Sequence, residues 1–276
     1  MYINCKGKLI DLSHPKIMGI LNTTPDSFFS GSRSQNIDSA LKRIEKLLTE
    51  GADFIDIGGM STRPGSAEVS ESEELERVVP VVEKAVLEFP EIIISVDTYR
   101  SKVARETAEV GAAIINDISA GSMDEELLKT VADLKVPYIL MHMQGSPQNM
   151  QTNPSYGDVT LEVNEFLSMK INELKSLGIH DIILDPGFGF GKTLEHNYEL
   201  FRQINTLGFG DFPLLVGISR KSMITQLFKI SAEEALNGTS VLNTMALEKG
   251  AKILRVHDVK EAKQALEIWS RVSNKL

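Results

Sequence analysis

The stretch "EIIISVD" (residues 91–97) is an almost unbroken run of apolar, mostly β-branched residues that ends in a carboxylate. A short run of this kind, without polar alternation, is typical of a strand covered on both faces, as in a parallel sheet. Similar runs recur along the chain: "KIMGILN" (16–22), "DFIDIGG" (53–59), "AAIINDI" (112–118), "VPYILMH" (136–142), "HDIILDP" (180–186), "FPLLVGIS" (212–219) and "AKILRVHD" (251–258). The sequence therefore predicts eight buried strands.

Helical patterns separate these strands. Apolar residues recur at spacings of three and four in residues 37–50, 71–89, 101–111 and 160–178, and the last segment ends on Gly178, which suits a left-handed helix end. Eight strands alternating with helices in a chain of 276 residues predict a (β/α)₈ TIM barrel that forms a single domain over residues 1–276. A doubly wound sheet is the alternative.

Composition restricts the partners of the protein. The formal net charge of −9 repels nucleic acid and anionic membranes, so a phosphorylated substrate needs a local cationic patch. Cys5 is the one cysteine of the chain, which excludes an intrachain disulfide and a thiolate metal site. No run approaches the length of a membrane span, and the first residues lack an apolar secretory core. We therefore expect a cytoplasmic protein without nucleic-acid or membrane partners.

The stretch "ILDPGFGFGKT" (183–193) raises the question of a nucleotide phosphate loop. Such a loop needs four residues between its first glycine and the Gly-Lys-Thr triplet. Here three residues separate Gly187 from Gly191, and Pro186, which has no N–H, stands where the first glycine is needed. The sequence therefore disfavours nucleotide binding and indicates a strand that ends at Asp185, followed by a glycine-rich turn.

Two connections are longer than usual, namely residues 23–36 and 60–70, both rich in Gly, Ser, Thr and Pro. Long connections in compact domains are typical of functional loops. Both follow predicted strands, so we expect two mobile loops on the same face of the barrel.

Polar side chains end nearly every predicted strand. Helix capping explains any one of them, but it does not easily explain all of them together. In barrels of this kind the active site forms at the carboxyl ends of the strands. The side chains in question are Asn22, Asp56, Asp97, Asn116, Asp117, His142, Asp185, Ser219, Arg255 and His257.

The charges at these strand ends separate along the chain. Carboxylates and amides dominate the middle strands, whereas cations follow the seventh and eighth strands, where barrels often bind phosphate. This order predicts a substrate with a polar, donor-rich head and an anionic tail.

A set of motifs over nearly the whole chain resembles the bacterial dihydropteroate synthases. The motifs are "GILNTTPDSF", "DIGGMSTRPGS", "SVDTYRSKVA", "NDISAG", "LMHMQGSP", "LDPGFGFGKT", "GISRKSM" and "LRVHDV". The resemblance implies a transferase of folate biosynthesis that joins 6-hydroxymethyl-7,8-dihydropterin diphosphate to p-aminobenzoate and releases pyrophosphate. It also implies a Mg²⁺ requirement, a homodimer and a sulfonamide target.

The resemblance also implies roles for individual residues. Those expected to bind pterin are Asp97, Asn116, Asp185 and Lys221, with Met141, Ile118 and Phe190 against the ring. Those expected to bind p-aminobenzoate are Phe28, Thr62, Arg63, Pro64 and Ser222. The diphosphate is expected to meet Asn22, Arg63, Arg255 and His257, with Mg²⁺ on Asn22, and the catalytic roles fall to Asn22, Lys221, Arg255 and His257.

One residue departs from the family pattern, and two alternatives remain open. Met60 stands where family members often carry glutamate, which puts a role for that side chain in doubt. The nearest alternative is a pterin-binding methyltransferase that moves a methyl group from methyltetrahydrofolate to a corrinoid. Against it, the chain has "STRPG" and "SRKS" and lacks the cobalamin motif D-x-H-x-x-G. A non-catalytic pterin-binding protein is the other alternative, and it would tolerate loss of Thr62, Arg255 or His257, all of which are present.

Overall fold

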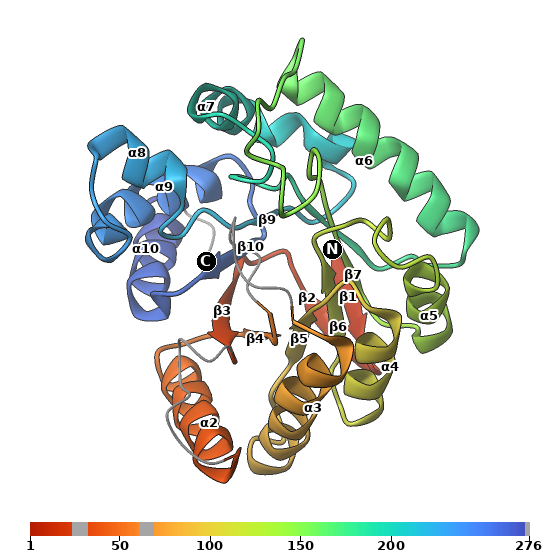
Figure 1. Ribbon diagram of the computed structural model, residues 1–276. Coiled ribbons are helices and arrows are strands. Elements are labelled where there is room, and N and C mark those ends of the chain that lie inside the picture. Colours follow the sequence, from red (N-terminus) through yellow and green to blue (C-terminus); the bar gives the residue numbers. More distant parts are fainter. Residues whose placement is uncertain (24–32, 61–68, 274–276) are drawn as a thin grey trace.

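The computed structural model describes residues 1–23, 33–60 and 69–273 (Figure 1). Eight parallel strands form one sheet in the order β8-β7-β6-β5-β4-β3-β10-β9. Their bounds are β3 Lys16–Asn22, β4 Phe54–Gly58, β5 Ile94–Asp97, β6 Ile114–Asp117, β7 Tyr138–Met141, β8 Ile182–Asp185, β9 Leu215–Val216 and β10 Ile253–Val256. A parallel bridge between Leu184 and Leu214 joins the two ends of the sheet, and the Leu184 N–H donates to Pro213 O at 2.9 Å. The sheet therefore closes into the predicted barrel.

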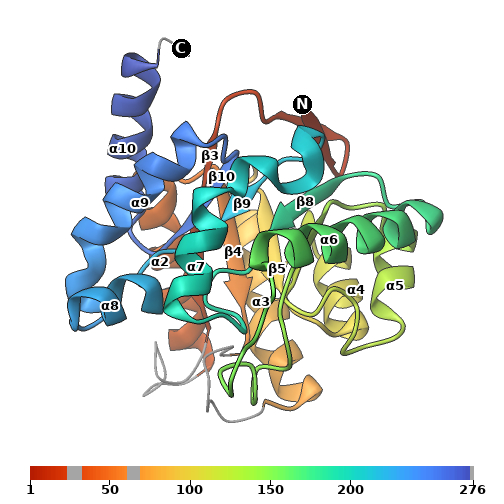
Figure 2. The same cartoon turned by 90° about the horizontal axis from the view of Figure 1, so that it is seen from above.

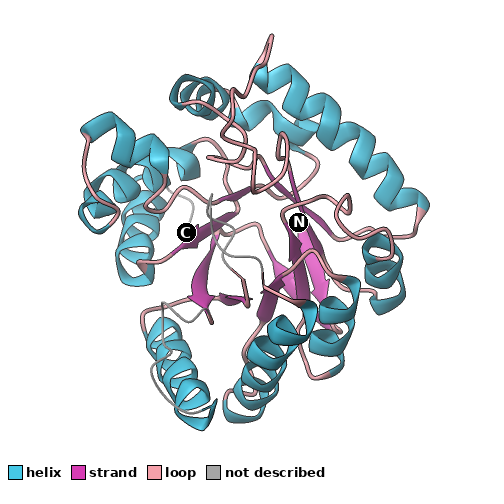
Figure 3. Cartoon of the chain, viewed as in Figure 1, coloured by secondary structure: helices cyan, strands magenta, loops and turns pink. Residues whose placement is uncertain are grey.

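Helices surround the barrel on its outside, as Figures 1 and 3 show. Their bounds are α2 Arg33–Thr49, α3 Glu71–Glu88, α4 Ser101–Glu109, α5 Leu127–Leu134, α6 Val159–Ser176, α7 Leu194–Arg202, α8 Ser222–Phe228, α9 Leu236–Glu248 and α10 Val259–Val272, with short 3₁₀ segments η1 Ile204–Gly210 and η2 Glu233–Ala235. The predicted helix over 160–178 is confirmed as α6, and Gly178 adopts a φ of +84° just after it. Among the helices described, none has the length and apolar character needed to cross a membrane.

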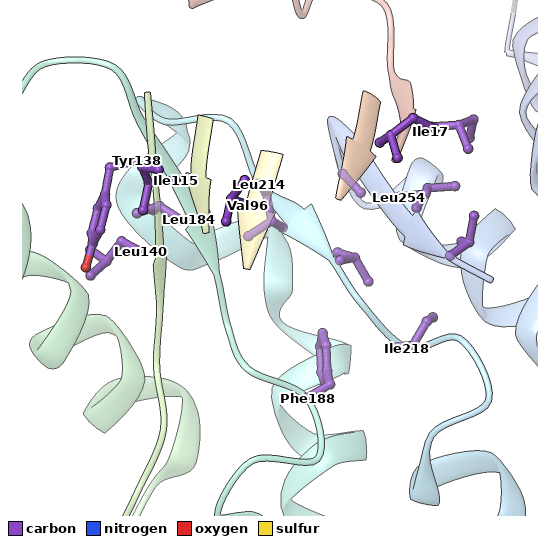
Figure 4. Close-up of a cluster of buried hydrophobic side chains, with 14 of the residues drawn as sticks. Ile17, Val96, Ile115, Tyr138, Leu140, Leu184, Phe188, Leu214, Ile218 and Leu254 are labelled. Carbon is purple, nitrogen blue, oxygen red and sulfur yellow. The ribbon is translucent and has the colours of Figure 1, made fainter. Parts of the chain in front are cut away.

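Two apolar clusters form the core because the strands are apolar on both faces. The larger cluster fills the space between the outer face of the strands and the helices, and Figure 4 shows part of it, from Tyr138 on β7 to Ile17 on β3. The smaller cluster lies inside the barrel and includes Met18 from β3, Phe54 from β4 and Ile114 from β6. All five residues of β4 are buried, as expected for a strand without polar alternation.

A two-stranded antiparallel hairpin, β1 (Tyr2–Cys5) with β2 (Lys8–Asp11), precedes the barrel and was not predicted. Its turn places Lys6 at φ +53° and Gly7 at φ +89°, which is the backbone of a tight two-residue hairpin turn. Buried side chains of the hairpin join the smaller cluster at the amino ends of the strands. The hairpin therefore closes the end of the barrel opposite the expected active site (Figure 2).

Two connections differ from the sequence-based expectation. Helix α2 begins at Arg33, so the loop predicted over 23–36 ends earlier, and its residues 24–32 lie outside the described part of the chain, as do residues 61–68 of the second loop. A third long connection, residues 142–158, joins β7 to α6 and was missed, since "LMHMQGSP" lies partly in the predicted strand.

Candidate active site

The guanidinium of Arg255 on β10 lies at the centre of a buried polar network at the carboxyl ends of the strands. Its Nε donates to Asp56 Oδ2 on β4 at 2.6 Å, and its Nη2 donates to Asp97 Oδ2 on β5 at 2.8 Å. From β6, the Asn116 amide also donates to Asp56 Oδ2, at 3.0 Å. The fold thus brings together four polar residues that sequence analysis had placed at separate strand ends.

The Arg255 guanidinium donates hydrogen bonds to two carboxylates in this network, those of Asp56 and Asp97. Burial lowers the pKa of Arg255, but the charges of Asp56 and Asp97 outweigh it, so the net pKa rises above its usual value. Burial raises the pKa of Asp97 to about 7, against the opposing attraction of Arg255 and with the help of repulsion from Asp56. The side of the network at Asp97 therefore changes charge near neutral pH.

Asn22 ends β3 beside this network. Gly58 lies between Asn22 and Asp97 in the sheet register, and a Cβ placed on Gly58 would lie 3.5 Å from Asp97 Cβ and 3.7 Å from Asn22 Oδ1. Within the described residues, the Asn22 side chain takes part in no hydrogen bond. Asn22 therefore borders the network at the carboxyl ends of the strands.

Asp185 and Lys221 form the second part of the site. Asp185 ends β8 and accepts the Gly187 N–H on Oδ1 at 2.7 Å. Burial raises its pKa, while Lys221 opposes that rise. Burial likewise lowers the pKa of Lys221 to about 8, against the attraction of Asp185. The two groups therefore favour each other's charged form.

Lys221 also contacts the glycine-rich turn after β8. Its Nζ donates to Phe188 O at 2.7 Å and lies 4.7 Å from the centroid of the Phe190 ring. A Cβ placed on Gly217 would lie 3.8 Å from Lys221 Nζ and 3.8 Å from Arg255 Cβ, so both cations border this glycine. Asp97, Asn116, Asp185, Lys221 and Arg255 thus share the carboxyl-terminal face of the barrel.

The three apolar side chains expected against the pterin ring have different environments. Met141, the β7 partner of Asp185 in the register, and Ile118 are buried, whereas Phe190 is partly exposed. Phe190 therefore offers a ring face to a ligand, while Met141 and Ile118 belong mainly to the packed wall.

His257 lies beside Ser219, two residues after Arg255. His257 directly follows the last residue of β10, Val256, and its expected role at the diphosphate stays a prediction. Ser219 Oγ accepts the His257 backbone N–H at 3.2 Å and lies 3.1 Å from its Nδ1. Ser222, the first residue of α8, follows Lys221 at the N-cap.

The remaining predicted site residues lie outside the described ranges. They are Phe28, Thr62, Arg63 and Pro64, all within 24–32 or 61–68. The expected roles of these four side chains at p-aminobenzoate and diphosphate therefore stay predictions.

Two buried residues of the site were not assigned a role from the sequence. Lys192 has 2% of its surface exposed, and its Nζ lies 3.0 Å from His142 Nδ1 and donates to Gly187 O at 3.0 Å. Burial lowers the pKa of Lys192 to about 7 and that of His142 to about 3. Lys192 points back into its own turn, which accords with the rejection of a phosphate loop. In the sequence, the only indication that this pair belongs to the site was the position of His142 at the end of a predicted strand.

The described residues contain no cluster of three His, Cys, Asp or Glu side chains that could hold a metal. Mg²⁺ commonly binds one or two protein oxygens together with substrate phosphates and water. The amide oxygen of Asn22, next to the network of Arg255, is a ligand type that fits this manner of binding, in which the substrate supplies most of the ligands.

Comparisons with known proteins agree with these features. The family described as "Pterin binding enzyme" matches residues 18–257. The dihydropteroate synthase of Escherichia coli (strain K12) is 47% identical over 270 residues, covering 97% of this chain and 95% of the relative. The dihydropteroate synthase of Haemophilus influenzae is 46% identical over 276 residues, covering 99% of this chain and 100% of the relative.

Solved structures give the same result. Yersinia pestis dihydropteroate synthase, determined as a sulfonamide drug complex, superimposes with a TM-score of 0.93 at 45% identity, over 99% of this chain and 100% of that one. Xanthomonas albilineans dihydropteroate synthase in complex with 7,8-dihydropteroate gives a TM-score of 0.89 at 37% identity, over 99% of both chains. The TIM-barrel prediction is therefore confirmed by strand order and by structural similarity.

Proposed function

This chain belongs to the dihydropteroate synthase family of pterin-binding enzymes, and we propose that it forms 7,8-dihydropteroate for folate synthesis from a dihydropterin diphosphate and p-aminobenzoate. The observation that carries the proposal is the meeting of Asp185, Asn116 and Lys221 with Arg255 at one end of the barrel. The first three suit a donor-rich heterocycle, and the last suits an anionic tail.

The carboxylate of Asp185 recognises the pterin. The pterin edge carries N–H and NH₂ donors, and a carboxylate accepts two such donors side by side. Asp185 Oδ1 already accepts the Gly187 N–H, which holds the carboxylate in place while its remaining lone pairs face the ligand. Asn116 both donates and accepts, and Lys221 donates to ring acceptors beside the Phe190 face.

The reaction breaks the bond between the pterin CH₂ carbon and the diphosphate oxygen, and it forms a bond from that carbon to the arylamine nitrogen. The electron-rich dihydropterin can carry positive charge on the CH₂ carbon, so the diphosphate leaves with the bonding electron pair. Arg255 and His257 stabilise the departing charge. The neutral arylamine then attacks and releases its proton to solvent, so no strong base is needed.

Asn22 would hold Mg²⁺, which would supply additional charge neutralisation for the leaving group. The p-aminobenzoate site is expected to involve Ser222 together with Phe28, Thr62, Arg63 and Pro64. A sulfonamide would then compete for that site, as the drug complex of the Yersinia pestis relative suggests.

A direct assay tests the proposed reaction. Purified protein is mixed with the dihydropterin diphosphate, p-aminobenzoate and Mg²⁺, and dihydropteroate and pyrophosphate are quantified by mass spectrometry. Equal amounts of both products are expected, together with strong loss after chelation of Mg²⁺. Pyrophosphate release without dihydropteroate would show hydrolysis only and would contradict the transferase function.

We also propose that two copies associate through α8, α9 and α10, which lie together on one flank of the barrel (Figure 1). Large apolar side chains are exposed on these helices, namely Leu227, Phe228, Val241, Met245, Ile268 and Val272. A second copy is the partner that the family resemblance implies. Light scattering after gel filtration should give twice the mass of 30.5 kDa, and Phe228→Lys should reduce it. The cytoplasmic location stays a prediction from the sequence.

A further inference from the structure

The turn after β8 is held by side chains that donate to five consecutive backbone carbonyls. Lys192 Nζ donates to Gly187 O at 3.0 Å and to Phe190 O at 3.1 Å, and Lys221 Nζ donates to Phe188 O at 2.7 Å. Gln151 Nε2 donates to the Gly189 oxygen at 2.6 Å, and the Tyr156 hydroxyl donates to the Gly191 oxygen at 2.7 Å. Two lysines therefore hold the carbonyls at 187, 188 and 190.

Lys192 is the deepest of these donors. Its ammonium has three N–H groups and three acceptors, because the third contact is His142 Nδ1 at 3.0 Å. Burying an ammonium is costly unless its donors are all satisfied, so this arrangement stabilises a charge that the interior would otherwise reject. The charged groups that face it electrostatically are Asp185 and Lys221.

The turn has little freedom to take another shape. A Cβ on Gly187 would lie 1.8 Å from His142 O, and a Cβ on Gly191 would lie 2.4 Å from Gln144 O. Both glycines have positive φ, +67° and +61°. The turn therefore lies directly on the backbone of residues 142–144, and Lys192 is the cation that joins its two ends.

We propose that Lys192 is a positioning residue for pterin recognition. By joining Gly187 O to Phe190 O, its ammonium sets the place of the Phe190 ring, of the carbonyl that Lys221 contacts and of the N–H that Asp185 accepts. Lys192 acts through these three neighbours and does not itself reach the ligand. The inference rests on the proposed function, which assigns pterin to the same neighbours.

The test compares Lys192→Met with a control that weakens a buried hydrogen bond elsewhere. Tyr138→Phe is the matched control, because the buried Tyr138 hydroxyl donates to Asp117 Oδ2 at 2.6 Å, and Tyr138 belongs to the larger apolar cluster between the strands and the helices. Thermal unfolding measures the stability of both variants, and calorimetry measures binding of 6-hydroxymethylpterin and, separately, of pyrophosphate. Lys192→Met should weaken pterin binding by about tenfold or more, since hydrogen bonds to charged groups are strong. The pyrophosphate affinity of Lys192→Met should stay within about twofold of wild type, because Lys192 makes no hydrogen bond to Arg255 among the described residues. Both affinities of Tyr138→Phe should also stay within about twofold, because the Tyr138 hydroxyl bonds to Asp117 and not to a residue assigned to either ligand.

Steady-state kinetics provides a readout that a general loss of stability would not change. In Lys192→Met the KM of the dihydropterin diphosphate should rise while the KM of p-aminobenzoate stays constant. If both KM values rise together, or if Lys192→Met binds pterin as wild type does, the inference is wrong. If the wild-type protein binds no pterin, the proposed function fails and the inference falls with it.

A second, milder variant covers the case in which Lys192→Met does not fold. His142→Phe keeps an aromatic ring in contact with Phe166, whose centroid lies 4.9 Å from that of the His142 ring, and it removes one acceptor of the ammonium. A loss of about threefold to tenfold in pterin affinity is expected, in line with one missing hydrogen bond. Unchanged pterin affinity in a folded His142→Phe would overturn the proposal.

Discussion

Asp56→Asn tests how far the Arg255 network contributes to stability. The side chain of Asp56 is fully buried, and its Oδ2 accepts from both Arg255 Nε at 2.6 Å and Asn116 Nδ2 at 3.0 Å. Its Oδ1 has no hydrogen-bond partner among the described residues. Asparagine preserves the shape of the side chain, removes its charge and can place an NH₂ group at the oxygen position that has no hydrogen-bond partner among the described residues.

The expected cost follows from these contacts. Removing one partner of a buried ion pair typically costs about 3–5 kcal/mol, and an unsatisfied buried donor costs about 1–3 kcal/mol. Asp97 still accepts from Arg255 Nη2 at 2.8 Å, so part of the guanidinium charge stays compensated. We therefore expect Asp56→Asn to lower the free energy of unfolding by about 3 kcal/mol.

Urea unfolding at about pH 8, with equal slopes in both proteins, measures this loss. Asp53→Asn is the matched control, because Asp53 is partly exposed, with its Oδ1 3.4 Å from Lys16 Nζ. A partly exposed pair of this kind contributes about 1 kcal/mol or less. If Asp56→Asn destabilises the protein no more than Asp53→Asn, the assigned energetic role of the network is refuted.

Three further outcomes follow from the site. Burial raises the pKa of Asp97 to about 7, whereas an ordinary Asp has a pKa of ~4. Between these values the unfolded state has already lost the proton that the folded state keeps, so the free energy of unfolding falls as the pH rises. In Asp97→Asn, urea unfolding should show a smaller fall of this free energy over the same range. Asp185→Asn should weaken pterin binding by about tenfold or more, because a donor then faces a donor, and an unchanged calorimetric dissociation constant would remove Asp185 from the pterin site. Finally, p-aminobenzoate should bind much more tightly when pyrophosphate, Mg²⁺ and a pterin are present. This follows from the sequence-based expectation that two long connections, most of whose residues lie outside the described ranges, close over the ligand at a cost in free energy; equal calorimetric affinities would contradict this order.

The eight strands could be predicted because each is a short apolar run that the fold buries on both faces. Hairpin β1–β2 was missed because strands of four residues, partly exposed, carry little periodic signal. The connection over 142–158 was not predicted: β7 ends at Met141, and His142, the next residue, was assigned to the strand end.

The site could be predicted as a set of strand ends but not as a set of contacts. Asn116 and Arg255 were expected at the same face of the barrel, and both are there, yet nothing in the sequence indicated that Asp56 binds both of them. The letters "GKT" were equally compatible with a lysine that reaches outward. Only the packing of the turn against residues 142–144 turns Lys192 inward.

The ion pairs of Arg255 leave the guanidinium able to bind substrate. A guanidinium has five N–H donors, and Asp56 and Asp97 each use one of them. Within the described ranges, the other three donors make no hydrogen bond, while the two carboxylates hold the group against the strand ends and limit its rotation. In this arrangement the acidic residues orient the cation and do not compete with the anionic substrate for all its donors. It follows that Asp56→Asn should weaken binding of the dihydropterin diphosphate more than binding of the unphosphorylated hydroxymethylpterin, since only the former depends on the orientation of Arg255.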